Sequence, residues 1–522
     1  MRFALSALPL GFLLLFAAAP VARLLAEGWG TAEPGFWGLW ADAYLRGRVL
    51  WSLAQAGLSA ALCVLLGLPL AWVFARFEFA GRALALRALM LPFVVPTLVA
   101  AMGVLALFGP RGVLGIDGSD TPWLLVYGNV FFNLCLVVRA GVDALDQVSA
   151  SRVAAARTLG ATPWRAFWRV EWPAVRPWLA SAACLAFLYC LSGFGLALVL
   201  GGQRWATAEV EIYTLVAHEL ALGQAGVLAL WMLLLNGAVA LAYAAIEQRL
   251  AVPARADRLP RRAARGMGER AAVAAALALL GAVAAAPLLA IVWRAAPALA
   301  DGSAWRVLGE PATQLALGNT LRFTVLALAL ALPMGVLHAV SAQALRGWGV
   351  VWRAAAFLPF VVSPVTVAFG LLLLYPEWTA SLPLLVAAYA LIAYPFIAKA
   401  LAAALDAVPP HLAQAAATLG ASPWRVFWRV TLPQVWPALR RGTAFAAATM
   451  LGEFAVSLFL SRPEWLTLTT LIHQRLGRPG ESNLQAALVL AGLLMALALL
   501  VFVLIEGRAR PRPDPADHAR TA

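Results

Sequence analysis

Lysine is almost absent from this chain, and charged residues of every kind are few. Lys399 is the only lysine among 522 residues, and Asp, Glu, Lys and Arg together make up 12% of the sequence. No glycine-rich run precedes Lys399, so the chain lacks the Gly-x4-Gly-Lys loop that cradles nucleotide phosphates. The sequence therefore predicts no nucleotide cofactor held by this chain through such a loop.

Cysteine and histidine are scarce as well. Cys63, Cys135, Cys184 and Cys190 all fall inside apolar runs without CxxC spacing, and the five histidines are scattered. Cysteines in such runs are expected to be small buried hydrophobes. No cluster of Ser, His, Asp or Glu suggests an enzyme embedded in a membrane. The sequence thus predicts neither a metal site nor catalytic residues.

Hydrophobic residues, in contrast, make up 63% of the chain. They form long apolar runs between short loops that contain arginine, a pattern typical of a polytopic membrane protein. The net charge of +14 would suggest nucleic acid as a partner for a soluble protein. Here the arginines lie in the loops that set the orientation of a membrane protein. The expected partner is therefore the lipid bilayer, and nucleic acid is not expected to bind.

One sequence block occurs twice. Residues 158–170 read TLGATPWRAFWRV, and residues 418–430 read TLGASPWRVFWRV, 260 positions later. The run LPFVV at 91–95 likewise returns at 358–362. Internal repetition at such a period indicates two fused copies of one domain. The offsets differ, so loop or span lengths between the two blocks have drifted.

Runs long enough to cross a hydrocarbon core, about 20 residues, predict an all-α polytopic membrane protein of about twelve transmembrane helices in two parallel six-helix repeats. Because six is even, both repeats enter the membrane with the same sidedness. The first run could be a cleaved secretory signal, but its length favours an uncleaved span. The predicted spans are 3–25, 51–75, 86–108, 123–140, 178–200, 225–246, 271–293, 320–342, 354–375, 382–401, 442–460 and 484–506.

The arginine-containing loops suggest a division of the chain. Residues 1–248 form a first membrane domain and 271–506 a second, with a solvated linker at 249–270 and a tail at 507–522. The linker, the tail and the loops after the second and fourth spans of each copy carry most of the arginines, so this face should be cytoplasmic. Both termini are then cytoplasmic. Arg139 and Lys399, which end equivalent spans, are expected to orient the chain rather than to contact substrate.

The repeated block predicts a short helix-turn-helix on the arginine-rich face. Ala155 and Ala156 can begin a helix that ends at Gly160, and Pro163 can begin the next one. The second helix carries Trp164, Phe167 and Trp168 on one face and Arg165 on another. The second copy has the same features at Ala415, Ala416, Gly420, Pro423, Trp424, Arg425, Phe427 and Trp428.

Two interpretations of these elements are open on their chemistry alone. They could fit two equal grooves of a two-fold symmetric cytoplasmic partner. They could instead lie at the membrane surface, with tryptophan at the headgroup level and arginine on lipid phosphates.

The block resembles the cytoplasmic loop signature of ABC importer permeases, Glu-Ala-Ala-x3-Gly-x9-hydrophobic-x-Leu-Pro. The matching residues are Ala155, Ala156, Gly160, Val170 and Pro173, then Ala415, Ala416, Gly420, Val430, Leu432 and Pro433. Ala154 and Gln414 stand where the signature has its acidic residue, and Trp172 replaces the leucine. Any docking is then expected to depend on shape and on Arg157, Arg165 and Arg425.

This resemblance implies a permease of the fused two-domain type in a bacterial inner membrane. Residues 154–173 and 414–433 would be coupling loops that dock on a homodimeric ATP-binding subunit, which would use the ATP and magnesium. A periplasmic binding protein would deliver the substrate. A secondary transporter of six plus six spans is an alternative, although it would not need twin docking helices.

The substrate is expected to be thiamine or thiamine diphosphate, because residues 200–213 and 468–477 resemble segments of thiamine permeases. Ferric iron is the alternative. Glu453 is the one acidic residue expected well inside a span, where a carboxylate is costly and lines a path or finds a partner. It could favour a cationic substrate in the translocation pathway, or it could cap a helix break.

Overall fold

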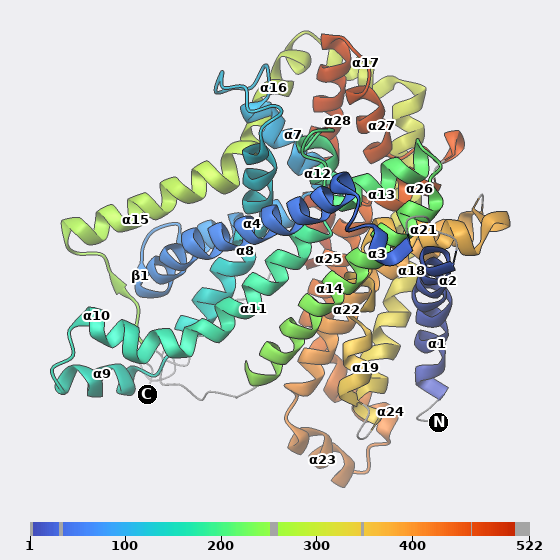
Figure 1. The fold of residues 1–522 in the computed structure, drawn as a ribbon. Coiled ribbons are helices and arrows are strands. Elements are labelled where there is room, and N and C mark those ends of the chain that lie inside the picture. The colour runs from blue at the N-terminus through green and yellow to red at the C-terminus, as the bar shows by residue number, and fades with distance from the viewer. Residues whose placement is uncertain are drawn as a thin grey trace.

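The computed structural model describes residues 4–30, 35–250, 259–345, 349–379, 381–460 and 462–506. Within these ranges the chain is a bundle of helices, with only two strands of two residues each (Figure 1). The predicted all-α membrane fold is thus confirmed. The predicted tail at 507–522 and residues 251–258 of the predicted linker lie outside the described residues.

The elements of the first half are α1 (Ala4–Leu13), a π-helical turn (Leu14–Ala18), α2 (Ala19–Gly30), α3 (Gly35–Gly38), α4 (Ala43–Arg76), β1 (Phe77–Glu78), α5 (Arg82–Ala88), α6 (Leu91–Val94), α7 (Thr97–Phe108), α8 (Pro122–Leu145), α9 (Ala150–Thr158), α10 (Pro163–Ala166), a π-helical turn (Phe167–Glu171), α11 (Trp172–Leu191), α12 (Gly195–Leu200), α13 (Ala208–Ala217) and α14 (Leu222–Leu250).

Those of the second half are β2 (Arg262–Ala263), α15 (Met267–Leu280), a π-helical turn (Gly281–Ala285), α16 (Ala286–Ala300), α17 (Ser303–Gly309), α18 (Pro311–Ala344), α19 (Gly349–Ala355), α20 (Leu358–Val361), α21 (Pro364–Leu374), a 3-10 turn (Pro376–Trp378), α22 (Leu382–Asp406), α23 (Pro410–Thr418), α24 (Pro423–Val426), a π-helical turn (Phe427–Thr431), α25 (Leu432–Leu451), α26 (Ala455–Leu460), a 3-10 turn (Pro463–Trp465), α27 (Leu468–Leu476) and α28 (Glu481–Glu506).

The two halves repeat each other element by element. The π-helical turn at Leu14–Ala18 returns at Gly281–Ala285, an offset of 281 − 14 = 267 residues that holds through the start of α21. From α8 and α22 onward the offset is 382 − 122 = 260 residues. The change therefore lies between α7 and α8, where the loop that follows α7 is longer than the loop that follows α21.

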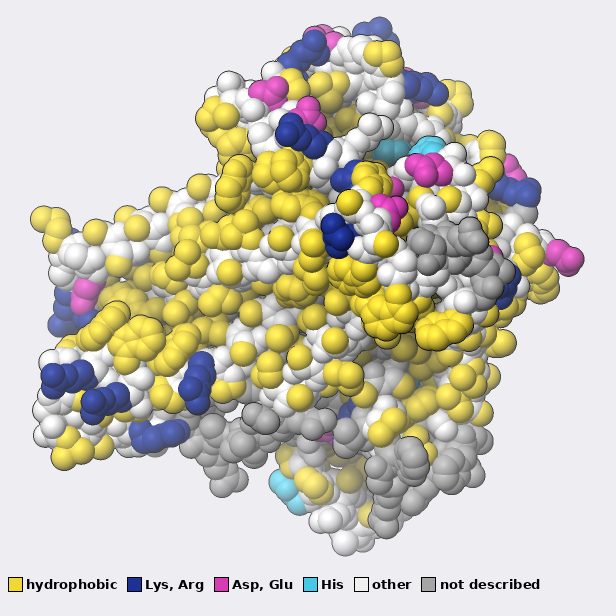
Figure 2. Space-filling view, in the orientation of Figure 1, with side chains coloured by type: hydrophobic (Ala, Val, Ile, Leu, Met, Phe, Trp, Pro, Cys, Tyr) yellow, Lys and Arg dark blue, Asp and Glu magenta, His cyan; other side chains and the backbone are white. Residues whose placement is uncertain are grey.

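Nine helices in the described ranges are long and apolar enough to cross a membrane, or up to ten when the bent pair Arg82–Val94 and Thr97–Phe108 is counted as one span. The two other predicted spans, 354–375 and 442–460, coincide with the shorter α21 and with α25, which carries Arg440 and Arg441. Hydrophobic side chains form a broad band across the visible face of the bundle (Figure 2).

Four predicted spans are interrupted at positions where continuous helices were expected. The helix axis turns by 107° between α6 and α7. The equivalent α20 and α21 are separate helices with residues 362–363 between them. The predicted spans 178–200 and 442–460 run across breaks at 192–194 and 452–454. Proline explains the first break, because Pro96 cannot donate a helical hydrogen bond. At the last break, a Cβ on Gly452 would lie 2.6 Å from the Cβ of Pro96, so glycine permits this close approach.

The first helices of the two halves are exchanged. The α1–α2 segment contacts α18 and α21 of the second half, while α15–α16 contacts α4 and α7 of the first half. In each of these two contacts, one glycine allows the neighbouring helix to approach closely. A Cβ on Gly103 would lie 2.8 Å from the carbonyl oxygen of Pro287, and a Cβ on Gly370 would lie 2.9 Å from that of Pro20. These pairs are equivalent in the repeat, so the exchange is symmetric.

Most residues at 259–270 of the predicted linker are exposed, but this segment contacts the first half. β2 pairs in parallel with β1, and Arg261 donates to the Asp146 carboxylate over 2.6 Å. The Arg262 guanidinium lies 5.3 Å from the centre of the Phe77 ring. Residues 261–263 are therefore fixed on the end of the bundle where α9 and α10 lie.

Candidate functional site

The first copy of the repeated block forms the predicted helix-turn-helix. Gly160 ends α9 with a φ of +83°, and the Ala161 N–H donates to the Ala156 carbonyl over 3.0 Å. This left-handed ending favours glycine, because a side chain there costs free energy. The hydroxyl of Thr162 then accepts from the Arg165 N–H over 3.3 Å at the start of α10, where Pro163 is the first residue.

The second copy repeats this geometry. Gly420 has a φ of +80°, and the Ala421 N–H donates to the Ala416 carbonyl over 3.1 Å. The Ser422 hydroxyl accepts from the Arg425 N–H over 3.4 Å, and Pro423 begins α24. Both predicted helix ends and both predicted proline starts are therefore present. The two elements lie at the same end of the bundle (Figure 1).

Each element exposes an aromatic cluster, which we call the docking face: Leu159, Trp164, Phe167 and Trp168 in the first copy, and Leu419, Trp424, Phe427 and Trp428 in the second. Trp164 is 69% exposed and Trp424 is 70% exposed. The ring centroids of Trp164 and Trp168 are 5.5 Å apart, and those of Trp424 and Trp428 are 5.4 Å apart. Exposed apolar patches of this kind mark contact with another protein or with a membrane.

The other predicted residues of these elements frame the docking faces. Ala155 and Ala415 are exposed, while Ala156 and Ala416 are half-buried. Arg165 and Arg425 are exposed too, and within the described ranges neither forms an ion pair. Their positive charge is thus available to a partner.

An ion pair that was not predicted from the sequence anchors the first element. The Glu171 carboxylate lies 2.5 Å from the Arg76 guanidinium at the end of α4, and both side chains are mostly buried. The equivalent of Glu171 in the second half is Thr431, so this anchor belongs to one copy. The sequence feature that could have indicated this ion pair is Glu171 itself, the single acidic residue near an otherwise basic block.

Replacing Glu171 with Gln is expected to destabilise the protein by about 1–3 kcal/mol, because Arg76 would be left mostly buried without a counter-charge. Thermal unfolding of the purified protein in detergent measures this change. The matched control is Asp406→Asn, which removes the exposed pair with Arg353 at 3.1 Å and should cost under about 1 kcal/mol. Equal shifts in the two variants would contradict the anchoring role.

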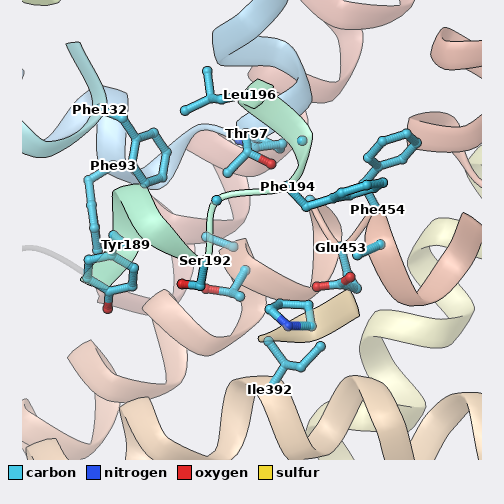
Figure 3. Close-up of a pocket in the computed structure, with 18 of the residues that line it drawn as sticks. Phe93, Thr97, Phe132, Tyr189, Ser192, Phe194, Leu196, Ile392, Glu453 and Phe454 are labelled. Atoms are coloured by element: carbon cyan, nitrogen blue, oxygen red, sulfur yellow. The ribbon is translucent and has the colours of Figure 1, made fainter. Parts of the chain in front are cut away.

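A cavity of about 180 Å³ lies where the broken spans of both halves meet (Figure 3). Its walls come from the breaks between α6 and α7, between α11 and α12, and between α25 and α26, and from α8, α20, α21 and α22. Residues that line it include Phe93, Pro96, Thr97, Asn129, Phe132, Asn133, Tyr189, Ser192, Gly193, Phe194, Pro359, Phe360, Pro364, Ile392, Phe396, Thr449, Gly452, Glu453 and Phe454.

Four of the aromatic residues that line the cavity form two equivalent pairs. Phe194 and Phe454 occupy matching positions in the two halves, and their rings stack with centroids 5.7 Å apart at 25°. Phe93 and Phe360 also match, and each lies edge-on to Tyr189 at 5.7 and 6.0 Å. The cavity lining is therefore pseudo-symmetric at these four rings, whereas Phe132, Tyr189 and Phe396 have equivalents that are not aromatic.

Glu453 breaks this symmetry, because its equivalent in the first half is Gly193. It is 8% exposed and is the only formally charged residue among the described residues that line the cavity. One carboxylate oxygen accepts from the Val456 N–H over 2.9 Å, at the start of α26. Both sequence interpretations of Glu453, a wall of the pathway and a cap on a helix break, thus have a geometric basis.

Two more buried acids lie on α13, and neither was assigned a role from the sequence. Glu209 accepts from the Ser363 hydroxyl over 2.6 Å, which joins the first half to the second. Glu211 accepts from the Tyr44 hydroxyl over 2.9 Å and lies 3.3 Å from the Arg48 guanidinium.

Lys399 also joins the halves. Its ammonium donates to the Tyr243 hydroxyl over 2.6 Å and lies 3.4 Å from the Glu247 carboxylate on α14. The sequence predicted orientation of the chain for Lys399 rather than substrate contact, and it gave no indication of this contact between the halves.

Comparison with known proteins points to one family. The sequence model of the family described as the inner-membrane component of binding-protein-dependent transport systems matches residues 64–252 and 327–512. The thiamine transport system permease protein of Escherichia coli K12 is 28% identical over 528 residues, which cover 94% of each chain. Its counterpart from Salmonella typhimurium is 28% identical, over 97% of this chain and 96% of that protein. A sulfate transport system permease protein of Synechocystis is 29% identical over 242 residues, covering 44% of this chain and 88% of that protein.

Proposed function

This chain belongs to the family of inner-membrane components of binding-protein-dependent transport systems, and from that premise we propose that it is the translocating subunit of an ATP-driven importer of thiamine or thiamine diphosphate. A separate ATP-binding subunit would supply the energy, and a periplasmic binding protein would deliver the substrate. The family and the apolar helices make the chain a multi-pass inner-membrane protein. We place both of its termini in the cytoplasm.

The observation that carries this proposal is the pair of docking faces at one end of the bundle. Their helices share residue type, turn geometry and exposure, with Trp164 and Trp424 exposed to 69% and 70%. Two equal faces fit a partner with two-fold symmetry, which a homodimeric ATP-binding subunit has. Each docking face would insert into one groove of the dimer, with Arg165 and Arg425 beside it.

The proposed cycle is alternating access driven through these faces. Binding of ATP brings the two partner subunits together, the two elements move with them, and the bundle opens toward the binding protein. The π-helical turns after α10 and α24 join each element directly to α11 and α25. Motion of a docking face is therefore passed to helices whose far ends, at Leu191 and Leu451, border the cavity.

Two observations support thiamine compounds as the substrate. The full-length relatives named above are thiamine permeases, and they share the fused arrangement of this chain. The cavity also offers aromatic rings, and these suit a flat heteroaromatic molecule.

The test of this proposal is uptake into proteoliposomes that contain the chain and its ATP-binding subunit, with the binding protein added outside. Thiamine or its diphosphate should accumulate only when ATP is enclosed. Uptake driven by a proton or sodium gradient, with the chain alone in the membrane, would contradict the proposal and indicate a secondary transporter.

Replacing Gly160 and Gly420 together with Val is expected to reduce ATPase activity stimulated by the loaded binding protein severalfold. A side chain in the left-handed conformation costs about 1–2 kcal/mol per residue, so each turn would change shape while membrane insertion stays intact.

The matched control for this variant is Gly115→Val with Gly302→Val. Those glycines have φ of +64° and +75°, and no atom lies within 4 Å of a Cβ placed on either. They lie far along the chain from both docking faces, so the control complex should keep its stimulated activity. Equal loss in both double variants would show that backbone strain alone is responsible.

A further inference from the structure

We propose that the first docking face binds the ATP-binding subunit through a border of arginines that the second docking face lacks, and that each groove of that subunit is bordered by acidic residues. This inference rests on the proposed function and deepens it, because it names the surface chemistry of the partner and the half of the chain that attracts it. The apolar centres of the two docking faces match, but their borders differ.

Three arginines beside the first docking face have no counterpart in the second copy. At the positions 260 residues later, the second copy has leucine, alanine and tryptophan. All three arginines are exposed, and within the described ranges none of them forms an ion pair. We call them the arginine border: Arg152 and Arg157 on α9 and Arg176 on α11, where the second copy has Leu412, Ala417 and Trp436.

The arginine border lies on the elements that contact the docking face. α9 contacts α10 and the π-helical turn at Phe167–Glu171, and this turn contacts α11. Figure 2 shows dark blue side chains gathered where α9 and α10 lie in Figure 1, whereas α23 contains no arginine. Trp164 lies on α10 and Trp168 in the π-helical turn. The positive charges are therefore placed beside the tryptophans that a groove would receive.

Orientation of the chain in the membrane does not explain this difference. The two elements lie at the same end of the bundle, and orientation depends on the number of basic residues near the ends of the spans. The second copy has two arginines further along α25, Arg440 and Arg441, where the first copy has Ala180 and Ser181. Arg440 donates to the Ile505 carbonyl on α28 over 2.7 Å. The two copies thus carry similar basic charge, but only the first places it around its docking face.

Unpaired arginines beside an exposed apolar face favour a partner that is acidic at the same place. Residues 150–176 contain one acidic residue, Glu171, and its mostly buried carboxylate already pairs with Arg76. The arginine border therefore keeps its positive charge. Charges at the edge of an interface mainly accelerate association and make it dependent on salt. The first docking face thus attracts the partner over a distance, and the second binds through apolar contact.

A homodimeric partner gives this asymmetry a second consequence. The two grooves of a homodimer are identical, so the acidic border that meets the first docking face is also present at the other groove. There the wild-type chain offers no additional arginine, only an apolar edge that includes Trp436, which is 49% exposed. Arginines placed on the second copy should therefore find acidic partners as well. The repeat itself provides the variants, because each copy shows which residues these helices accept.

The experiment measures the association rate constant of the ATP-binding subunit with the full chain in nanodiscs of zwitterionic lipid. Salt is set to about 0.05 M and about 0.5 M, between which the Debye length falls about threefold. We expect the wild-type rate constant to fall about tenfold or more over this range. The variant Arg152→Leu with Arg157→Ala and Arg176→Trp, which gives the first copy the residues of the second, should lose about tenfold at low salt and little at high salt.

The reverse variant is Leu412→Arg with Ala417→Arg and Trp436→Arg. It should associate severalfold faster than wild type at low salt and equally fast at high salt, because it offers arginines to the second groove.

The matched control removes the same charge away from the docking faces. Arg204, Arg306 and Arg478 are exposed in the loop after α12, on α17 and in the loop after α27. The variant Arg204→Ala with Arg306→Ala and Arg478→Ala should associate as wild type does at both salt concentrations.

The salt dependence is a readout that a damaged fold would not reproduce, because misfolding slows association at both salt concentrations. If wild type and the first-copy variant associate equally fast at low salt, or if the reverse variant gains nothing, the inference is overturned while the proposed function stands. An effect that appears only after anionic lipid is added would also overturn it, and would assign the arginines to lipid phosphates. If the wild-type chain does not bind the ATP-binding subunit at either salt concentration, the proposed function is overturned, and the inference with it.

Discussion

Replacing Trp164 and Trp424 together with Ala is expected to abolish stable association of this chain with its ATP-binding subunit. Tryptophans at the centre of protein interfaces each contribute about 2 kcal/mol or more. Removal of both would weaken binding by about 4 kcal/mol, or about a thousandfold. Co-purification of the two subunits from membranes, followed by titration in detergent, measures this loss.

The control variant for this tryptophan pair removes two tryptophans of similar exposure that lie outside the repeated elements. Trp293 is 72% exposed on α16 and Trp305 is 68% exposed on α17, at the opposite end of the bundle (Figure 1). The variant Trp293→Ala with Trp305→Ala should keep full affinity for the ATP-binding subunit. If Trp164→Ala with Trp424→Ala still binds as wild type does, the docking faces are membrane-surface helices instead.

Replacing Gly103 and Gly370 together with Ala is expected to loosen the exchange of first helices between the halves. The added Cβ atoms would lie 2.8 and 2.9 Å from the carbonyl oxygens of Pro287 and Pro20, well inside van der Waals contact. Overpacking of this kind costs about 1–3 kcal/mol per site. The temperature of thermal unfolding in detergent should fall clearly, and uptake should fall with it.

Helical glycines with free space around them provide the comparison. Gly47 on α4 and Gly318 on α18 have no atom within 4 Å of a Cβ placed on them. Alanine favours helix over glycine by about 0.5–1 kcal/mol, so Gly47→Ala with Gly318→Ala should be neutral or slightly stabilising. An unchanged unfolding temperature in Gly103→Ala with Gly370→Ala would mean that the helices shift apart without cost.

Local signals in the sequence predicted the helix ends and helix starts of the two repeated elements. Gly160 and Gly420 end their helices, Pro163 and Pro423 begin the next ones, and the tryptophans of each element contact each other. These features depend on residues within a few positions of one another. The geometry of a turn or a cap is set by such neighbours, and a single sequence contains all of them.

The cavity could not be predicted in the same way. Pro96 is a local signal for a helix break, but apolar runs do not reveal a break such as the one at Gly452, because the surrounding residues stay hydrophobic. The bond between Glu209 and Ser363 joins residues 154 positions apart, and no local pattern links them. The position of Glu453 in a cavity lined by both halves likewise depends on how the repeats pack.

The exchanged first helices have a consequence for how the protein is made. The α1–α2 segment leaves the ribosome long before α21, its partner, which begins at Pro364. At about 5–20 residues per second, translation of the intervening stretch takes roughly 20–70 s. During that interval α2 can contact α14 of its own half, but the contacts of this segment with α18 and α21 must wait until the second copy is inserted. Covalent fusion guarantees that this second copy arrives next to it, once for every first copy produced.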